Sequence, residues 1–526
     1  MTKPLVPVRQ VIVIAFFIAL LSYLNADIRL NGADEGFLWY GASHVLRGQV
    51  PVRDFLSYDP GRYYFCAAFF SLFGDGIMSL RLAETVFQFI SISFALLTMR
   101  RVLRSRWALL GAGFLAFFCM VLPFRNFDSG IPLITLFFAV RLLENPSYSR
   151  HFTAGVFCGL AAFFGINHGL YAFLSYYLLI VFCDMKGLLK DPLKKKAVFL
   201  GGICTGLLPL MGMMIFIPGF FESYSTMFLE NVHRLRHGMT NVPLAAPWPW
   251  LFHWDGFMTA LQTEFWWHLQ YISRYALGVS FLLLILFYGL SIPVVFRLKK
   301  ETVAQRALFI ASVFTGVFYL HHIFSRADSP HFGEGFFPVV AGILSIPALF
   351  PSLNKNLSRS LVLLVSLAGF LAAGLLTNIV FKIFTPKAAL VHYTIGKDKI
   401  WIIKPQADMV DHIKKIVSEN VPPNETLLMA PIMTTFYCLL EKDSPVYDLY
   451  FLSPQSDRLQ QKMIQDLEAK HVNWGIVGSG VVDGGTEFRL ADTQPRLWEY
   501  LATRFEAVPT SEPLRLGYQL IRRRSV

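Results

Sequence analysis

Two adjacent acids, Asp34 and Glu35, follow the first apolar segment of the chain, within the sequence NGADEGFLWYG. A carboxylate in such a position can accept a proton from an attacking hydroxyl or bind a divalent cation. The next stretch, VPVRDFLSYDPGRYY, adds arginines, acids and tyrosines, which include Arg53, Asp54, Tyr58, Asp59, Arg62, Tyr63 and Tyr64. Arginine pairs with phosphate oxygens through a fixed fork of donors. Because aromatic rings pack against sugar faces or lipid chains, these residue types together suit a sugar joined to a lipid phosphate.

Further polar side chains gather at the ends of three later apolar segments. PFRNFDSG contains Arg125 and Asp128, and INHG contains Asn167 and His168. The stretch HHIFSRADSPHFGEGFFP adds three histidines, two acids and an arginine, which are His321, His322, Arg326, Asp328, His331 and Glu334. Ionisable groups beside apolar segments are costly and tend to mark sites. Each stretch alone could be a solvated loop, but several on one side of a membrane favour a site there.

The composition indicates which elements position these residues. Of the 526 residues, 54% are hydrophobic and 16% are charged, and the mean hydropathy is +0.49. Soluble domains usually carry roughly 25% charged residues, so we predict a polytopic membrane protein. The apolar segment 11–24 follows Lys3 and Arg9 as in a signal peptide, but no small-residue cleavage site comes after it. We therefore expect a retained anchor.

The net charge of +12 is a topology signal and does not point to a nucleic-acid partner. Lys and Arg balance Asp and Glu in the region after residue 383, so the whole excess lies in the apolar part of the chain. There it forms short basic clusters between apolar segments, as the positive-inside rule requires. All of these clusters agree with one orientation, with the N-terminus in the cytoplasm.

The apolar segments predict about eleven membrane-crossing helices, since a span needs about 20 apolar residues. Their approximate centres are Phe17, Ile90, Leu115, Phe137, Phe157, Leu178, Leu207, Ile285, Val313, Ile343 and Leu371. With an odd number of spans, the C-terminal region lies outside the cytoplasm. The loop of residues 25–81 lies there too, and we expect it to contain two short helices in the membrane interface. Residues 218–274 hold a tryptophan cluster typical of an interfacial belt, with stacking on a sugar ring as the alternative.

The region after residue 383 alternates strand-like and helical runs. TLLMA, IMTTFYCLL, PVYDLY, NWGIVGS and LGYQLIRRR are the strand-like runs, and RLQQKMIQDLEAK and RLWEYLATRF are the helical ones. Such alternation predicts a small α/β domain with a largely parallel sheet. We therefore divide the chain into a transmembrane domain of residues 1–383, with its large outer loop 25–81, and an extracytoplasmic domain of residues 384–526.

The motifs G-x-D-E-G, G-Q-V-P-V-R-D-F and Y-D-P-G-R-Y-Y, in this order within residues 32–64, resemble those of the GT-C glycosyltransferases. In particular, the chain resembles bacterial relatives of the protein O-mannosyltransferase and aminoarabinose-transferase families. Weaker support comes from residues 125–128 and 326–331. The resemblance implies a GT-C-like α-helical polytopic membrane protein with a small C-terminal extracytoplasmic α/β domain. It also implies transfer of a sugar from a polyprenyl-phosphate donor to an acceptor hydroxyl at the outer face, usually with inversion.

The resemblance also implies roles for the acids. Asp34 becomes the general base, with Glu35 as the second choice or as support for the acceptor or a cation. Asp128 matches a second acid that related enzymes carry after the third span. Asp34 and Asp128 could share a divalent cation, Mg or Mn, and no tightly bound cofactor is expected.

The remaining residues are assigned to the substrate. Arg326, or alternatively Arg62, would hold the donor phosphate, and His331 would assist the leaving phosphate or orient Asp328. Arg125 is a further phosphate ligand. The other predicted substrate-binding residues are Arg53, Asp54, Tyr58, Tyr63, His168 and Asp328.

Several other interpretations stay open. Glu35 could simply offset a helix dipole, Pro60–Gly61 could make a turn with Tyr63 and Tyr64 in the interface, and the histidines around His321 could bind zinc. A transporter or a flippase of lipid-linked glycans would also need many spans and buried charges, but such folds often show repeats and midplane sites. A non-catalytic partner in an envelope assembly is a third option.

The acceptor is not readable from the sequence, and glycan, lipid and protein hydroxyls all remain open. The resemblance places the chain in the bacterial inner membrane, with its site and C-terminal domain in the periplasm. The expected partners are the polyprenyl-phosphate sugar donor, the acceptor and membrane lipids.

Overall fold

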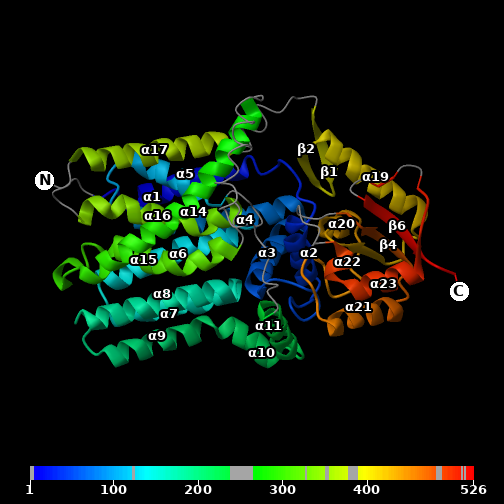
Figure 1. Ribbon diagram of the computed structural model, residues 1–526, viewed down its shortest axis with the longest axis horizontal. Coiled ribbons are helices and arrows are strands. Elements are labelled where there is room, and N and C mark those ends of the chain that lie inside the picture. Colours follow the sequence, from blue (N-terminus) through cyan, green and yellow to red (C-terminus); the bar gives the residue numbers. More distant parts are fainter. Residues whose placement is uncertain are drawn as a thin grey trace. The chain divides into compact units, whose positions relative to one another are not determined.

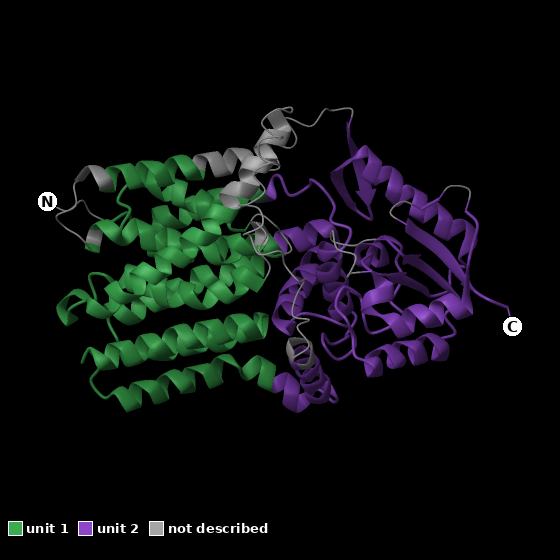
Figure 2. Ribbon diagram, in the orientation of Figure 1, with its two compact units in different colours: residues 1–22, 84–211, 241–377 green, residues 23–83, 212–240, 378–526 purple. Residues whose placement is uncertain are grey.

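The computed structural model describes residues 5–120, 125–236, 265–325, 329–349, 355–376, 389–480, 489–510, 513–514 and 517–525. The chain divides into two compact units (Figure 2). Unit 1 comprises Met1–Ser22, Glu84–Met211 and Asn241–Thr377, and unit 2 comprises Tyr23–Ala83, Gly212–Thr240 and Asn378–Val526. The predicted outer loop 25–81 therefore groups with the C-terminal region.

Unit 1 is built from long apolar helices that run side by side (Figure 1). These helices are α1 (Val8–Tyr23), α4 (Ile77–Met99), α5 (Arg106–Phe118), α6 (Asn126–Glu144), α7 (Tyr148–Phe164), α8 (Ile166–Met185), α9 (Pro192–Gly206), α10 (Leu208–Phe216), α14 (Phe265–Arg297), α15 (Ala307–Ser325), α16 (Ser329–Leu349) and α17 (Lys355–Leu376). A short 3-10 helix, Lys300–Thr302, precedes α15. The core of this unit is an extensive cluster of aliphatic and aromatic side chains, and polar side chains such as Glu84, His168 and Glu334 are also buried in the unit.

The helices agree with the predicted spans in position more closely than in length. Ten of the eleven predicted centres lie inside a helix, and Leu207 lies at the break between α9 and α10. Among the described residues, five helices are long and apolar enough to cross a membrane, or six if the pair α9 and α10, bent by 52°, forms one span. α1 and α5 are apolar but have 16 and 13 residues, shorter than the roughly 20 residues that a perpendicular span needs. The chain is thus a mostly helical membrane protein with five or six candidate spans in its described part.

Glycines set the close packing of α7 against α9. A Cβ atom on Gly155 would lie 2.2 Å from the carbonyl oxygen of Phe199, and one on Gly206 would lie 2.1 Å from the carbonyl oxygen of Val156. Small residues spaced four apart let helix backbones approach closely inside a membrane. The two helices therefore touch backbone to backbone.

Unit 2 combines three helices from the first 240 residues with a mixed C-terminal region. The three helices are α2 (Asp34–Leu46), α3 (Pro60–Phe73) and α11 (Phe220–Arg236). The C-terminal elements are β1 (Leu390–Ile395), β2 (Asp398–Ile403), α19 (Lys404–Asn420), β3 (Leu427–Ala430), α20 (Thr434–Leu439), α21 (Asp457–Ala469), β4 (Trp474–Gly478), α22 (Leu490–Thr493), α23 (Pro495–Arg504), β5 (Phe505–Ala507) and β6 (Tyr518–Arg523). The predicted α/β character is confirmed for this region.

The prediction of a largely parallel sheet is wrong. The four-stranded sheet has the order β3-β4-β6-β5, in which only β3 and β4 are parallel. β6 pairs antiparallel with both β4 and β5. β5 and β6 are consecutive strands that pair with each other, and β6 lies between β5 and β4, so only one strand pair keeps the parallel direction.

Two strand-like runs are also not strands. IMTTFYCLL contains helix α20, and PVYDLY forms bends and loop. Strand preference depends on packing context, and here Thr434 and Thr435 bond the carbonyl groups of the first outer loop instead of a strand partner. The hairpin β1–β2 and helix α19 lie outside the predicted elements. The other five predicted runs form β3, β4, β6, α21 and α23.

The first outer loop is built into unit 2. All ten residues of α2 from Glu35 to His44 are buried, which leaves this helix little surface for lipid. The prediction that this loop contains two short helices is confirmed by α2 and α3, and their place in the membrane interface stays a prediction. Before α2, the chain pairs with β2, where the Arg29 N–H donates to the Trp401 carbonyl at 2.7 Å.

Candidate active site

The predicted site residues are distributed over both units, and each unit has its own arrangement. Unit 2 contains the residues of the first outer loop, which are Asp34, Glu35, Arg53, Asp54, Tyr58, Arg62 and Tyr63. Unit 1 contains Arg125, Asp128, His168 and His331. Arg326 and Asp328 lie outside the described residues, so their predicted roles stay predictions.

Glu35 holds the first outer loop together. Both of its carboxylate oxygens accept bonds from the Arg81 guanidinium, at 2.6 Å from Nε and 2.9 Å from Nη2. The Glu35 side chain is only 3% exposed, and the backbone N–H of Asn31 also donates to it. Arg81 further donates to the Arg29 carbonyl at 2.8 Å. This geometry supports a structural role for Glu35, and the role of Asp34 as the base stays a prediction.

Asp34 is the first residue of α2, and its carboxylate is partly exposed. Its backbone N–H donates to Asn31 Oδ1 at 2.9 Å, which fixes the start of the helix. Its Oδ1 accepts a bond of 2.7 Å from the Tyr450 hydroxyl, which comes from the C-terminal region. A partly exposed acid whose carboxylate has a fixed position suits a general base.

Aromatic rings gather the other first-loop residues next to Asp34. The Phe37 ring lies edge-on to Tyr450 at 5.8 Å and to Tyr58 at 5.2 Å. The Arg62 guanidinium lies over the Tyr58 ring at 4.6 Å, a cation–π contact. Asp34, Tyr58 and Arg62 are thus linked through Phe37 and Tyr450. Tyr58 is 52% exposed and Arg62 is 3% exposed.

Three other predicted substrate residues of this loop have structural contacts. Arg53 and Asp54 form a two-contact ion pair, with both distances 2.8 Å, and the Arg53 guanidinium holds the pKa of Asp54 below its usual range. Tyr63 is fully buried, and its hydroxyl accepts the Tyr58 N–H at 3.0 Å. Tyr63 is therefore part of the core, and binding of substrate by any of the three stays a prediction.

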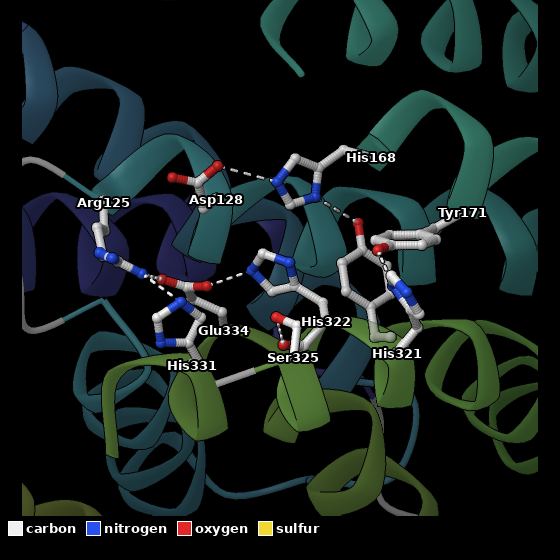
Figure 3. Close-up of polar contacts among 10 residues, drawn as sticks. Arg125, Asp128, His168, Tyr171, His321, His322, Ser325, His331 and Glu334 are labelled. Carbon is white, nitrogen blue, oxygen red and sulfur yellow. Dashed lines mark hydrogen bonds and ion pairs between the residues drawn. The ribbon is translucent and has the colours of Figure 1, made fainter. Parts of the chain in front are cut away.

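In unit 1, Arg125, Glu334, His322 and His331 form one cluster (Figure 3). Arg125 Nη1 donates to Glu334 Oε1 at 3.0 Å and lies 2.9 Å from His331 Nε2. The second oxygen of Glu334 is bonded to His322 Nε2. The Glu334 side chain is 1% exposed, whereas that of Arg125 is 21% exposed. A buried carboxylate between Arg125 and His322 fixes both side chains, and Arg125 keeps part of its surface accessible.

Asp128 lies in a second chain of polar contacts (Figure 3). Its Oδ1 is 3.0 Å from His168 Nε2, and His168 Nδ1 is 3.2 Å from the Tyr319 hydroxyl. His168 and Tyr319 are fully buried, but the Asp128 side chain is 18% exposed. A carboxylate accepts hydrogen bonds, so His168 carries its proton on Nε2. The His168 and His322 rings, 5.5 Å apart, connect this chain to the Arg125 cluster.

The structure thus brings Arg125, Asp128, His168 and His331 together and adds residues that the sequence interpretation missed. Glu334 and His322 were recognised there only as polar residues, and Tyr319 and Tyr171 received no role. Tyr171 contacts His321 at 2.8 Å between its hydroxyl and Nδ1. The sequence feature that could have identified Tyr171 is its position three residues after His168, because residues at i and i+3 share one helix face.

The described residues were compared with the requirements of a metal site. Among the described residues, no group of three or more His, Cys, Asp or Glu side chains is placed to hold one. His322 and His331 contact Glu334 and Arg125, so the zinc alternative gains no support in this part of the chain. Asp34 and Asp128 lie in different units, and a cation shared by them stays a prediction.

One known family matches part of the chain. Residues 58–215 match the family of dolichyl-phosphate-mannose-protein mannosyltransferases. The resemblance to relatives of the protein O-mannosyltransferases is thereby confirmed. The matched segment is less than a third of the chain and includes Arg62, Arg125, Asp128 and His168, whereas Asp34 precedes it.

Two solved structures are also similar to the chain. They are crystal structures of ArnT from Cupriavidus metallidurans, one in the apo state and one bound to undecaprenyl phosphate. Both are 14% identical, cover 97% of this chain and of their own, and have TM-scores of 0.48 and 0.46. No curated protein sequence matches the chain.

Proposed function

We propose that the chain is a membrane glycosyltransferase that moves a sugar from a polyprenyl-phosphate donor to an acceptor hydroxyl outside the cytoplasm. The family match to residues 58–215 supports this reaction class. The observation that carries the proposal is the neighbourhood of Asp34, where a partly exposed carboxylate and the Arg62 guanidinium are linked through the rings of Tyr450, Phe37 and Tyr58. A base and a phosphate-binding group are the two parts that this reaction requires.

In the proposed reaction, the acceptor oxygen bonds to the anomeric carbon as the bond from that carbon to the phosphate breaks. Asp34 accepts the hydroxyl proton, and the electron pair of the broken bond stays on the lipid phosphate. The sugar passes through an oxocarbenium-like state, as in glycoside hydrolysis. Cationic groups stabilise the charge that develops on the phosphate, and Arg62 and Arg125 are the described candidates for this role.

The second acid, Asp128, has a supporting role in this proposal. His168 holds one of its oxygens, and the side chain is 18% exposed. It could bind hydroxyl groups of the sugar or help to orient the donor. No step of the proposed reaction uses a metal ion.

The proposed orientation follows the distribution of basic residues. The N-terminus lies in the cytoplasm of a bacterial cell, and the C-terminal region, with Asp34, faces the periplasm. The acceptor is a hydroxyl of a glycan, a lipid or a protein in the cell envelope.

The decisive experiment is sugar transfer in vitro with purified protein and several polyprenyl-phosphate sugars. Removing a general base costs on the order of 10²–10⁴-fold in rate, so Asp34→Asn should lose nearly all transfer. The matched control is Asp457→Asn, whose side chain is 64% exposed and pairs with Arg496; this variant should transfer at the original rate. Full activity of Asp34→Asn would overturn the assignment of the base. Movement of the lipid-linked sugar across vesicles without any transfer would favour a flippase instead.

A further inference from the structure

The C-terminal region forms several hydrogen bonds with the loop that carries Asp34. The Thr435 hydroxyl donates to the Asn31 carbonyl at 2.6 Å, and the Thr435 N–H donates to the Gly32 carbonyl at 3.3 Å. The Thr434 hydroxyl donates to the Ala33 carbonyl. Three consecutive carbonyl groups before Asp34 are therefore all bonded to α20.

These hydrogen bonds depend on direct backbone contact between α2 and α20. A Cβ atom on Gly36 would lie 2.1 Å from the Thr435 backbone nitrogen. Any larger residue at Gly36 would push the two helices apart. The start of α2 and the C-terminal region thus form one continuous piece of structure.

Tyr450, also in the C-terminal region, contacts the carboxylate of Asp34 directly. Its hydroxyl donates to Asp34 Oδ1 at 2.7 Å, and its ring packs on Phe37. The backbone of Tyr450 is fixed as well, because its N–H donates to Asp448 Oδ1 at 3.0 Å. Asp448 is 3% exposed, and its Oδ2 accepts a bond of 2.7 Å from Gln455. The position of the Tyr450 hydroxyl is therefore fixed by the packing of its ring on Phe37 and by the bond of its backbone to Asp448.

We propose that Tyr450 is a positioning residue for Asp34 and that the C-terminal region takes part in the transfer reaction by orienting the base. This inference rests on the proposed function. By holding one carboxylate oxygen, Tyr450 fixes the plane of the carboxylate and directs the second oxygen toward the acceptor hydroxyl.

The test compares two Tyr→Phe variants that each remove one bond from a hydroxyl to a carboxylate. Tyr450→Phe removes the bond to Asp34, and Tyr500→Phe removes a bond of 2.7 Å to Glu468 in the same region. Hydrogen bonds to charged groups correspond to about 10- to 100-fold in rate. We expect Tyr450→Phe to lower kcat by about this factor with KM nearly unchanged, whereas Tyr500→Phe keeps the original kcat.

Two further measurements separate positioning from a general loss of structure. In the Asp34→Asn background, adding Tyr450→Phe should cause no further loss, because the bond acts only through the carboxylate. Melting temperatures of the two single variants should agree, which shows that both are folded.

The outcomes distinguish this inference from the proposed function. Full transfer by Asp34→Asn would refute the proposed base, whatever Tyr450→Phe does. Loss of transfer in Asp34→Asn, together with an unchanged kcat in Tyr450→Phe, would overturn only the positioning role. A rise in KM alone in Tyr450→Phe would also overturn it, since the hydroxyl would then bind substrate.

Discussion

Glu35 and Arg81 form a two-contact ion pair in the interior of unit 2, with side chains 3% and 5% exposed. The pair joins the first turn of α2 to the first turns of α4. Arg81 also donates to the Arg29 carbonyl, so one guanidinium holds both ends of the segment that leads to Asp34. Of the two neighbouring acids, Glu35 stabilises the loop, and Asp34 keeps its carboxylate for the proposed reaction.

Glu35→Gln should therefore destabilise unit 2 more than it slows the chemical step. Removing one partner of a buried ion pair costs about 3–5 kcal/mol, because the other charge remains buried. We expect a clear drop in melting temperature in detergent and a lower yield, while the folded fraction keeps most of its kcat. Loss of kcat with an unchanged melting temperature would instead give Glu35 the role of base.

Glu334→Gln should weaken donor binding. Glu334 holds Arg125 and His322 through different oxygens, and without its charge Arg125, a predicted phosphate ligand, loses its fixed position. We expect KM for the polyprenyl-phosphate sugar to rise about tenfold, the equivalent of one weakened charge-assisted bond, with a smaller change in kcat. The control is Glu144→Gln, which breaks the more exposed ion pair with Arg101 in the same unit and should leave KM unchanged. An equal KM in both variants would contradict the role of this cluster.

The sequence was sufficient to find the apolar helices, because their length and hydrophobicity are local properties. It was also sufficient to single out Asp34 and Asp128, whose charge beside apolar segments is costly. The residues that contact these acids could not be predicted from the sequence in the same way. Tyr450 is 416 positions from Asp34, and Arg81 is 46 positions from Glu35. Such pairs depend on the tertiary fold, which no periodicity reports.

The errors in the C-terminal region have the same origin. PVYDLY has the aromatic and β-branched residues of a strand, but Asp448 and Tyr450 are used in a turn that places a hydroxyl on Asp34. IMTTFYCLL contains two threonines whose hydroxyls bind the first loop. In both segments, residues that favour strands take part in contacts with α2. The strand preference of these two segments was overridden where they contact Asp34, the predicted base, and the loop before it.

Gly155→Ala should destabilise the contact between α7 and α9. The added Cβ would lie 2.2 Å from the Phe199 carbonyl oxygen, and overpacking of this kind costs about 1–3 kcal/mol. Gly201→Ala is the matched control, since nothing lies within 4 Å of its added Cβ. We expect a lower melting temperature for Gly155→Ala alone. Equal melting temperatures for the two variants would show that these helices do not touch backbone to backbone.

The pH dependence of unit 2 should include a contribution from His44. Burial lowers the pKa of His44 below its ordinary value, against the opposing effect of Asp443, whose Oδ1 lies 3.3 Å from Nε2. Arg47 also lowers this pKa, whereas Gln49 and Asp75 raise it. A histidine with a lowered pKa in the folded state binds its proton more readily when unfolded. Its stabilisation is therefore complete above the ordinary pKa of about 6.5 and is lost as the pH falls below that value.

His44→Gln removes this titration and keeps a polar side chain of similar length. The wild-type melting temperature should fall more steeply than that of the variant between about pH 7 and pH 5, the interval around the ordinary histidine pKa. The measurement is a thermal melt at several pH values in the same detergent, with His471→Gln as the control because His471 is exposed. Parallel curves for the wild type and His44→Gln would show that the interaction with Asp443 fully offsets the effect of burial. A steeper fall in His44→Gln would reverse the sign of the predicted shift.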